Sequence, residues 1–271
     1  MPSFTRGTCQ LHYDMHAAPA GAPWVLFLHG LGSCADDWFL QQTALTERFA
    51  TLAPDLRGHG RSRGASGWPT MAEHARDVAA LLSHLQLPPV HIVGLSLGGA
   101  VGLQLAMDAP SAVRSLTAVN AFARWRPGPR GRRRGLQRFL LALTGQMRLN
   151  ARHIACGLFP RDDQQIMRQA AEMRIAENSS WDYFRNLVCV ARFDVRRRLG
   201  EISCPVLVVA GDRDATVPRS AKLELAERIP RARWCVVADS GHATPIDAAD
   251  QFNRLLLEFL NQVEVRTERA A

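Results

Sequence analysis

Lysine is almost absent from this sequence. Lys222 is the single lysine among 33 basic residues, so arginine carries nearly all of the positive charge, and the formal net charge is +8. An excess of this sign favours anionic partners at long range, and the planar guanidinium group can hold a carboxylate or phosphate through two hydrogen bonds. A general preference of the chain for arginine would produce the same excess, so charge alone selects no function.

Patterns typical of disulfide frameworks, metal sites and dinucleotide sites are also missing. The six cysteines are scattered without a C-x-x-C pair, no cluster of His, Cys and Asp has metal-ligand spacing, and no G-x-G-x-x-G occurs. We therefore expect free cysteines and no metal or cofactor.

The sequence has no apolar run of membrane-spanning length, and its start, MPSFTRGTCQLHYDM, has no apolar core of signal-peptide length. No nucleic-acid-binding motif accompanies the arginines. We expect a cytoplasmic protein that binds neither membrane nor nucleic acid, and the oligomeric state stays open.

What the sequence does have is an alternation of strand-like and helix-like segments. Of the 271 residues, 47% are hydrophobic and 21% charged, which is typical of a globular chain. Short continuous apolar runs such as WVLFL, VHIVGL and PVLVVAG predict strands that are buried on both faces. The predicted fold class is therefore α/β, with a doubly wound, mostly parallel sheet and right-handed crossovers.

Helices are expected between these strands, among them residues 36–49 and 70–87. In the second of these, Thr70 is suited to cap the helix N-terminus, and Glu73 completes a capping box.

The alternation lapses between residues 122 and 198, where helical patterns and a Pro/Gly/Arg-rich stretch occur without a convincing strand. A segment of this length is too long for a simple loop. We predict a helical cap at 122–198 over the strand ends, inserted in an α/β core made of residues 1–121 and 199–271.

One hydroxyl stands where a predicted strand turns into a helix. Ser96 lies in the G-x-S-x-G context GLSLG, whose glycines allow backbones to approach closely at a sharp turn. Leu97 opens the following helix, so its free N–H would face an oxyanion formed beside Ser96. This arrangement predicts a nucleophile rather than an ordinary turn serine.

Two more reactive side chains follow later strands. Asp214 lies at the end of the strand in GDRDATVP, and His242 follows the last strand in DSGHATP. A serine needs a histidine to take its proton and a carboxylate to orient that histidine. Asp212 and Asp239 are rivals for the acid, and we favour Asp214 because it closes the strand-end turn before a Val-Pro pair.

A second oxyanion donor is expected in the loop HGLGSCADDW after the strand at residues 24–28. Gly30 permits a tight turn there, so the backbone N–H of Leu31 can face the same site as Leu97. His29 precedes this turn, and we interpret it as a brace for the loop.

Five segments in their order along the chain, LFLHGLG, PDLRGHGRS, VGLSLGGAV, LVVAGDRDATVP and SGHATP, resemble the α/β-hydrolases that carry a helical cap, of the serine carboxylesterase type. The likeness extends over nearly the whole chain. It implies an eight-stranded, mostly parallel sheet with the cap inserted after the sixth strand. It also implies Ser96 as nucleophile, His242 as base, Asp214 as acid, and Leu31 with Leu97 as oxyanion donors.

Other polar residues are predicted to be structural. An Asp55–Arg57 pair and His59 would hold the glycine-rich turn PDLRGHGRS. His74 and His84 are expected at the surface, and Asp194 is expected to form a local salt bridge.

The cap segment provides arginines and apolar residues. Seven arginines lie between Arg124 and Arg138, and they predict either a solvated loop or a cationic rim. The predicted apolar pocket includes Phe122, Trp125, Trp181 and Val217, with Leu140 and Phe184 as further candidates.

The predicted function is hydrolysis of carboxylic esters of a small-molecule substrate through an acyl-enzyme. Three alternatives share the triad: lactone hydrolysis, C–C bond hydrolysis of β-diketone acids, and cleavage of methyl esters of acyl chains on an acidic carrier protein. A binding module that keeps the fold without turnover is the rival from another class.

Overall fold

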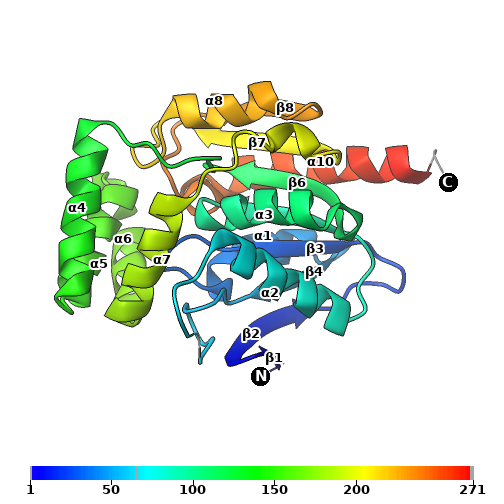
Figure 1. Ribbon diagram of the computed structural model, residues 1–271. Coiled ribbons are helices and arrows are strands. Elements are labelled where there is room, and N and C mark those ends of the chain that lie inside the picture. Colours follow the sequence, from blue (N-terminus) through cyan, green and yellow to red (C-terminus); the bar gives the residue numbers. More distant parts are fainter. Residues whose placement is uncertain (1, 65, 269–271) are drawn as a thin grey trace.

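The computed structural model describes residues 2–64 and 66–268. A single eight-stranded sheet runs through its centre in the order β1-β2-β4-β3-β5-β6-β7-β8 (Figure 1). β1 and β2 are antiparallel, β2 pairs antiparallel with β4, and the strands β4, β3, β5, β6, β7 and β8 are parallel to one another. The strands are β1 (Ser3–Arg6), β2 (Cys9–His16), β3 (Trp24–Leu28), β4 (Ala50–Pro54), β5 (Val90–Leu95), β6 (Val113–Val119), β7 (Val206–Gly211) and β8 (Ala232–Val237).

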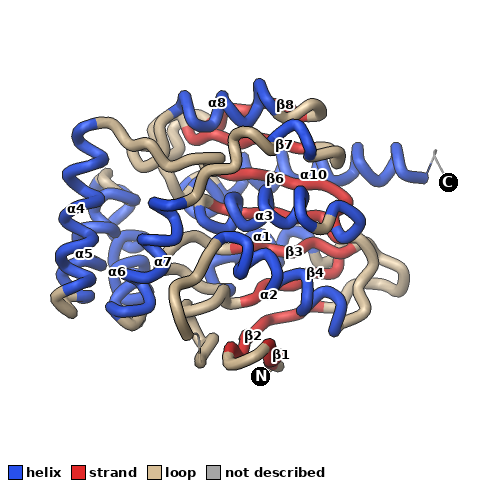
Figure 2. The backbone as a smooth tube through the Cα atoms, in the orientation of Figure 1, coloured by secondary structure: helices blue, strands red, loops and turns tan. Residues whose placement is uncertain are grey.

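Helices cover both faces of this sheet (Figure 2). α2, α3 and α8 pack on one face with a large apolar cluster beneath them, whereas α1 and α10 cover the other face through a second cluster. The helices are α1 (Phe39–Leu45), α2 (Met71–His84), α3 (Leu97–Asp108), α4 (Pro129–Leu143), α5 (Met147–Leu158), α6 (Gln165–Ala176), α7 (Ser180–Arg192), α8 (Arg219–Arg228), α9 (Thr244–Asp247) and α10 (Ala249–Glu268), with short 3₁₀ turns η1 (Ala35–Trp38), η2 (Pro110–Ala112), η3 (Asp162–Gln164) and η4 (Leu199–Glu201).

The predicted doubly wound, mostly parallel sheet is thus confirmed, and its central strands are buried on both faces as predicted. β7 buries all of its residues and β3 all but its first, because helices lie on both faces of the sheet. The capping box of α2 is also present: the Thr70 hydroxyl accepts a hydrogen bond from the N–H of Glu73, and the Glu73 carboxylate accepts one from the N–H of Thr70. The helix expected at 36–49 is shorter, with the 3₁₀ turn η1 followed by α1.

The four helices α4 to α7 lie between β6 and β7 in the chain, and Figure 1 shows them standing beside the carboxyl ends of the central strands. They share an apolar cluster of their own, with Tyr183, Phe184 and Ile154 among its buried members. All four fall within the residues predicted as a cap.

The Arg-rich stretch is a helix and not the loop that its prolines and glycines suggested. Pro129 stands at the first position of α4, where its missing N–H costs nothing. Arginine has a high helix propensity, and Gly135 lies where a Cβ would come within 2.8 Å of the Trp125 ring. Close packing on that ring, rather than a turn, accounts for this glycine.

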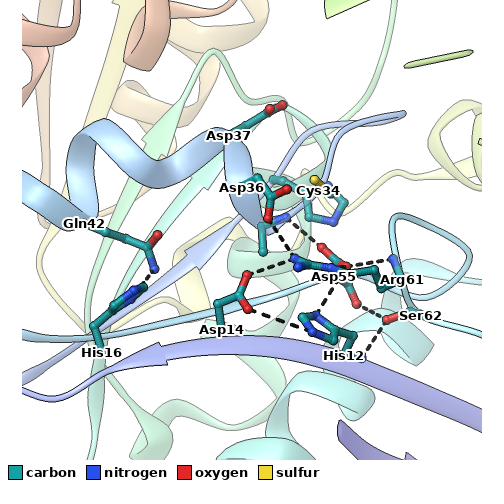
Figure 3. A network of polar contacts seen from close by, with 12 residues as sticks. His12, Asp14, His16, Cys34, Asp36, Asp37, Gln42, Asp55, Arg61 and Ser62 are labelled. Carbon is teal, nitrogen blue, oxygen red and sulfur yellow. Dashed lines mark hydrogen bonds and ion pairs between the residues drawn. The ribbon is translucent and has the colours of Figure 1, made fainter. Parts of the chain in front are cut away.

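The glycine-rich turn after β4 is held by a polar network (Figure 3). The Asp55 carboxylate accepts hydrogen bonds from the backbone N–H of Ala35 at 2.7 Å and of Arg61 at 2.8 Å, and from the Arg61 guanidinium at 3.0 Å. Arg61 also contacts Asp14 and Asp36, so one arginine ties together β2, η1 and the turn.

The prediction that Asp55 pairs with Arg57 is therefore wrong. Arg57 forms two hydrogen bonds with Asp77 of α2, at 2.7 and 2.9 Å, and Asp55 is bound by Arg61 instead. The residue types predicted a local ion pair, but the choice between two nearby arginines depends on tertiary contacts with α2.

The prediction for His74 is also wrong. It was expected at the surface but is buried, and its Nε2–H donates to the Asn186 side chain of α7 at 2.8 Å. The inserted helices cover this face of α2. His84 is exposed as expected, and Asp194 pairs with Arg196 and Arg124.

All six cysteines are unpaired, in agreement with the absence of a disulfide pattern. In the part of the chain that the structure describes, no helix has both the length and the apolar character needed to cross a membrane.

Candidate functional site

Ser96 occupies a sharp turn between β5 and α3. Its backbone has φ 54° and ψ −106°, an unfavourable conformation for a residue with a side chain. The Ser96 N–H donates to the carbonyl of Val119 in β6 at 2.9 Å, so the turn is tied to the neighbouring strand. The strain is retained because the strand and helix on either side determine the path of the chain.

The glycines around this serine are required by close backbone contacts. A Cβ on Gly98 would lie 1.9 Å from the carbonyl oxygen of Leu28, and one on Gly94 would lie 2.5 Å from the backbone of Gly98. Only glycine allows α3 to begin this close to β3. The G-x-S-x-G spacing is thereby explained by packing.

His242 and Asp214 meet at the carboxyl ends of β7 and β8. The His242 Nδ1 lies 3.1 Å from each carboxylate oxygen of Asp214, whose side chain is fully buried. Although burial alone would favour the neutral acid, His242 and Lys222 hold the pKa of Asp214 well below its usual range. An ionised carboxylate only accepts, so Nδ1 carries the proton and Nε2 is the basic nitrogen.

The rival carboxylates lie elsewhere. Asp212 accepts a hydrogen bond from the backbone N–H of Ser240 at 3.2 Å, and the exposed Asp239 pairs with Arg213. Of the three candidates, Asp214 is the one bound to His242.

Two residues that were not predicted as part of the site complete this cluster. The Lys222 ammonium group donates to Asp214 at 2.9 Å and to the Asn120 side chain at 3.1 Å. Asn120 follows β6 with a φ of 44°, and its Nδ2 donates to the backbone carbonyl of His242 at 2.9 Å. A polar residue directly after a buried parallel strand was the available signal for Asn120, whereas nothing local marks Lys222.

A cavity of about 110 Å³ joins this cluster to the inserted helices. Ser96 and His242 both line it, with Leu31 from the loop after β3. Its other walls come mainly from apolar residues of α5, α6 and α7, and the predicted pocket residues Phe122, Trp125 and Val217 are among them.

Trp181 is not a wall of this cavity, in contrast to the prediction. It is half exposed on α7 and contacts Trp68 and Phe184 in an aromatic cluster at the surface. Leu140 is exposed as well. Helical spacing identified the α7 aromatics as neighbours but could not indicate which one faces the cavity.

The candidate oxyanion donors lie on either side of Ser96. Leu97 is the first residue of α3, so its N–H has no acceptor within the helix. Leu31 lies in the loop that His29 braces: the His29 Nδ1–H donates to the Gly30 carbonyl at 2.8 Å, and Nε2 accepts from the N–H of Leu56 at 2.9 Å. Burial, with His59 nearby, lowers the pKa of His29 to about 3, so the brace is neutral.

Within the described ranges, no group of three or more His, Cys, Asp or Glu residues is placed to hold a metal ion. The site offers instead a serine hydroxyl, an imidazole with a free basic nitrogen, and an ionised carboxylate that orients it. These are the groups that nucleophilic acyl transfer uses.

The fold is that of a hydrolase class. The family model described as the alpha/beta hydrolase fold matches residues 23–249, which is most of the chain. The chain therefore belongs to the α/β-hydrolase family, and it is a hydrolase of that fold.

Particular relatives extend over the same length. The chain is 35% identical over 270 residues to "Putative carbamate hydrolase RutD" of Caulobacter vibrioides, covering 96% of this chain and 99% of the relative. Among solved structures, an enol-lactonase from Burkholderia xenovorans LB400 has a TM-score of 0.89 with 26% identity, covering 96% of this chain and 100% of that one. A thermophilic esterase from Thermogutta terrifontis has a TM-score of 0.82 with 25% identity, covering 94% of each chain.

Proposed function

We propose that this protein is a serine hydrolase that cleaves carboxylic esters through Ser96, His242 and Asp214. The proposal depends on one observation: His242, held by the ionised Asp214, lines the same cavity as Ser96. The strained turn at Ser96 supports it, because strain of this kind is concentrated at functional sites.

In the first half of the reaction, the Nε2 of His242 accepts the proton of the Ser96 hydroxyl as its oxygen attacks the ester carbonyl. The negative charge that develops on the carbonyl oxygen is stabilised by the backbone N–H groups of Leu31 and Leu97. His242 then gives the proton to the leaving alcohol, and the acyl group remains on Ser96.

In the second half, a water molecule enters as nucleophile. His242 takes its proton, the resulting hydroxide attacks the acyl carbonyl, and the C–O bond to Ser96 breaks. The proton returns to the serine oxygen and the carboxylic acid leaves. Asp214 keeps Nδ1 protonated throughout and offsets the positive charge of the imidazolium.

The helices α4 to α7 act in this proposal as a cap that supplies the acyl pocket. The cavity is mostly apolar around Phe122, Val190 and Ile175, and its size of about 110 Å³ suits small to medium acyl groups better than long chains. We place the protein in the cytoplasm, with a small-molecule ester as substrate.

The test is hydrolysis of p-nitrophenyl acetate and butyrate by the wild type and by Ser96→Ala. We expect the variant to lose at least about 10³-fold in kcat/KM, because no other group can replace the nucleophile. Ser111→Ala, an exposed serine in η2, is the control and should match the wild type. Equal rates for wild type and Ser96→Ala would refute the proposal and favour a binding module.

A second candidate is carbamate hydrolysis, favoured by the whole-length relative that carries this activity in its name. Addition of Ser96 to a carbamate carbonyl uses the same groups, and lactones, as in the name of the structural neighbour, do so as well. Comparing kcat/KM over matched esters, carbamates, lactones and β-diketone acids decides between them. The proposal requires the highest value for an ester, and Ser96→Ala must abolish whichever reaction is found.

A further inference from the structure

The single lysine of the chain is buried beside the proposed acid. The side chain of Lys222 is 1% exposed, and its ammonium group lies 2.9 Å from one carboxylate oxygen of Asp214 and 3.1 Å from the side-chain oxygen of Asn120. A buried lysine loses its hydration, so it remains only where its partners offset that loss. The two halves of the mechanism proposed above give it no role.

Both oxygens of the Asp214 carboxylate accept hydrogen bonds. One oxygen accepts the backbone N–H groups of Thr216 and Val217 at 2.8 and 3.1 Å, the other accepts Lys222, and both face His242. Lys222 therefore restrains the carboxylate in the plane and rotation that it presents to His242.

Lys222 also adds a positive charge next to the imidazole. Its nitrogen and the Nδ1 of His242 bind the same carboxylate, so they are at most about 6 Å apart. At that separation the buried ammonium group and an imidazolium at His242 would repel each other across the shared carboxylate.

Among the described residues, the other charged groups nearby have partners of their own, and the Asp247 carboxylate of α9 accepts the N–H of Gly241, next to His242, at 2.6 Å. α8 packs on β7, β8 and η4. β7 brings no charged side chain, β8 brings the exposed Arg233, which is bound to Gln262, and η4 brings Glu201, which is bound to Arg198. On α8 itself, Arg219 is exposed and adds positive charge near Lys222.

We infer that Lys222 is a positioning residue for the proposed reaction: it fixes the orientation of Asp214 and places a positive charge beside the imidazole of His242. That charge repels an imidazolium, so it favours the neutral imidazole that accepts the serine proton. The catalytic role of Lys222 rests on the proposed function, but its effect on His242 can be measured by NMR without substrate turnover.

The primary experiment follows the imidazole of His242 by NMR in protein labelled at histidine, titrated between pH 4 and 9 in the wild type, Lys222→Met and Lys222→Gln. The His242 signal is assigned by its loss in His242→Asn. Both variants remove the charge, whereas the glutamine keeps a hydrogen-bond donor toward Asp214. We expect both midpoints to move to higher pH by about one unit.

Arg219→Gln is the matched control, because it removes a positive charge from the same helix at an exposed position. Its His242 midpoint should stay within a few tenths of a unit of the wild type. If Lys222→Met fails to fold, Lys222→Gln provides the measurement. An unchanged His242 midpoint in a folded Lys222 variant would overturn the inference.

The kinetic experiment separates charge from positioning. If the enzyme hydrolyses esters, the acidic limb of kcat/KM should move to higher pH in both variants, and only Lys222→Met should also lose about tenfold or more in the plateau value. A uniform loss with no displacement of the limb would indicate a merely structural lysine. Absence of wild-type turnover would refute the proposed function but leave the NMR result decisive for Lys222.

Discussion

Close backbone contacts at Gly98 explain why this position tolerates no side chain. The chain must pass from β5 through the strained Ser96 into α3, and the first turn of α3 rests against the carbonyl groups at the end of β3. A side chain here would push α3 away from the sheet and move Ser96 with it. Position 98 must therefore be glycine, because the turn at Ser96 brings the first turn of α3 against β3.

We predict that Gly98→Ala destabilises the protein by about 3 kcal/mol or more, since the clash is with backbone and cannot be relieved by a rotamer change. Thermal unfolding measures this, and residual ester turnover should fall with it. Gly157→Ala in α5 is the control: nothing lies within 4 Å of its added Cβ, so its stability should be unchanged or slightly raised. Equal unfolding temperatures for Gly98→Ala and wild type would contradict the structure of this turn.

At the scale of elements, contacts with the inserted helices decide features that local sequence patterns could not predict. The parallel strands and the capping box of α2 were predictable because apolar runs and Thr70–Glu73 spacing act within a few residues. Burial of His74 depends on Asn186, which is 112 residues away in the chain. The Arg57–Asp77 pair and the position of Lys222 are likewise set by packing between elements.

The same distinction applies to the candidate site. Ser96, Asp214 and His242 each follow a predicted strand, and the sequence could place them at one edge of the sheet because carboxyl ends of parallel strands share an edge. Which aromatic side chain of α7 faces the cavity depends on the rotation of that helix. Helical spacing fixes which residues share a face but not the direction of that face, so Trp181 was misplaced.

α4 is an unusually basic element. Arg132, Arg133 and Arg134 are exposed and form no ion pair within the described residues, so their charges are available to an external anion. One form of the proposed function follows: the ester is presented by an acidic carrier protein that docks on α4. Surface charges of this kind act mainly on association.

We predict that Arg132, Arg133 and Arg134 changed together to Ala lower kcat/KM for a methyl ester on an acidic carrier protein by about tenfold at low salt, and that added salt removes the difference. Turnover of free methyl butyrate should be the same in both proteins. A triple variant at the exposed, remote Arg48, Arg76 and Arg231 removes as much charge and should leave carrier turnover unchanged. Salt-insensitive hydrolysis of the carrier ester would exclude the carrier hypothesis.

For the whole molecule, buried neutral histidines make folding sensitive to acid. Burial lowers the pKa of His29 to about 3 and that of His74 to about 4, in both cases with a further contribution from His59. The unfolded chain takes up protons at these histidines near pH 6.5, whereas the folded protein does not until the pH is much lower. Stability is therefore complete above about pH 6.5 and falls as the pH decreases toward these lowered values.

His74 allows the dependence of stability on protonation to be measured at a single histidine. In the wild type, its pKa difference implies a loss of about 3 kcal/mol of unfolding free energy between pH 6.5 and pH 4. His74→Gln keeps a donor for Asn186 but cannot titrate. Its unfolding free energy, from urea denaturation at a series of pH values, should fall less steeply over that range, by up to about 1.4 kcal/mol per pH unit. His84→Gln, on the exposed side of the same helix, should keep the wild-type slope. If His74→Gln keeps that slope too, the histidine is already protonated or solvated in the folded protein, and the close contact between α2 and α7 that buries it would have to be abandoned.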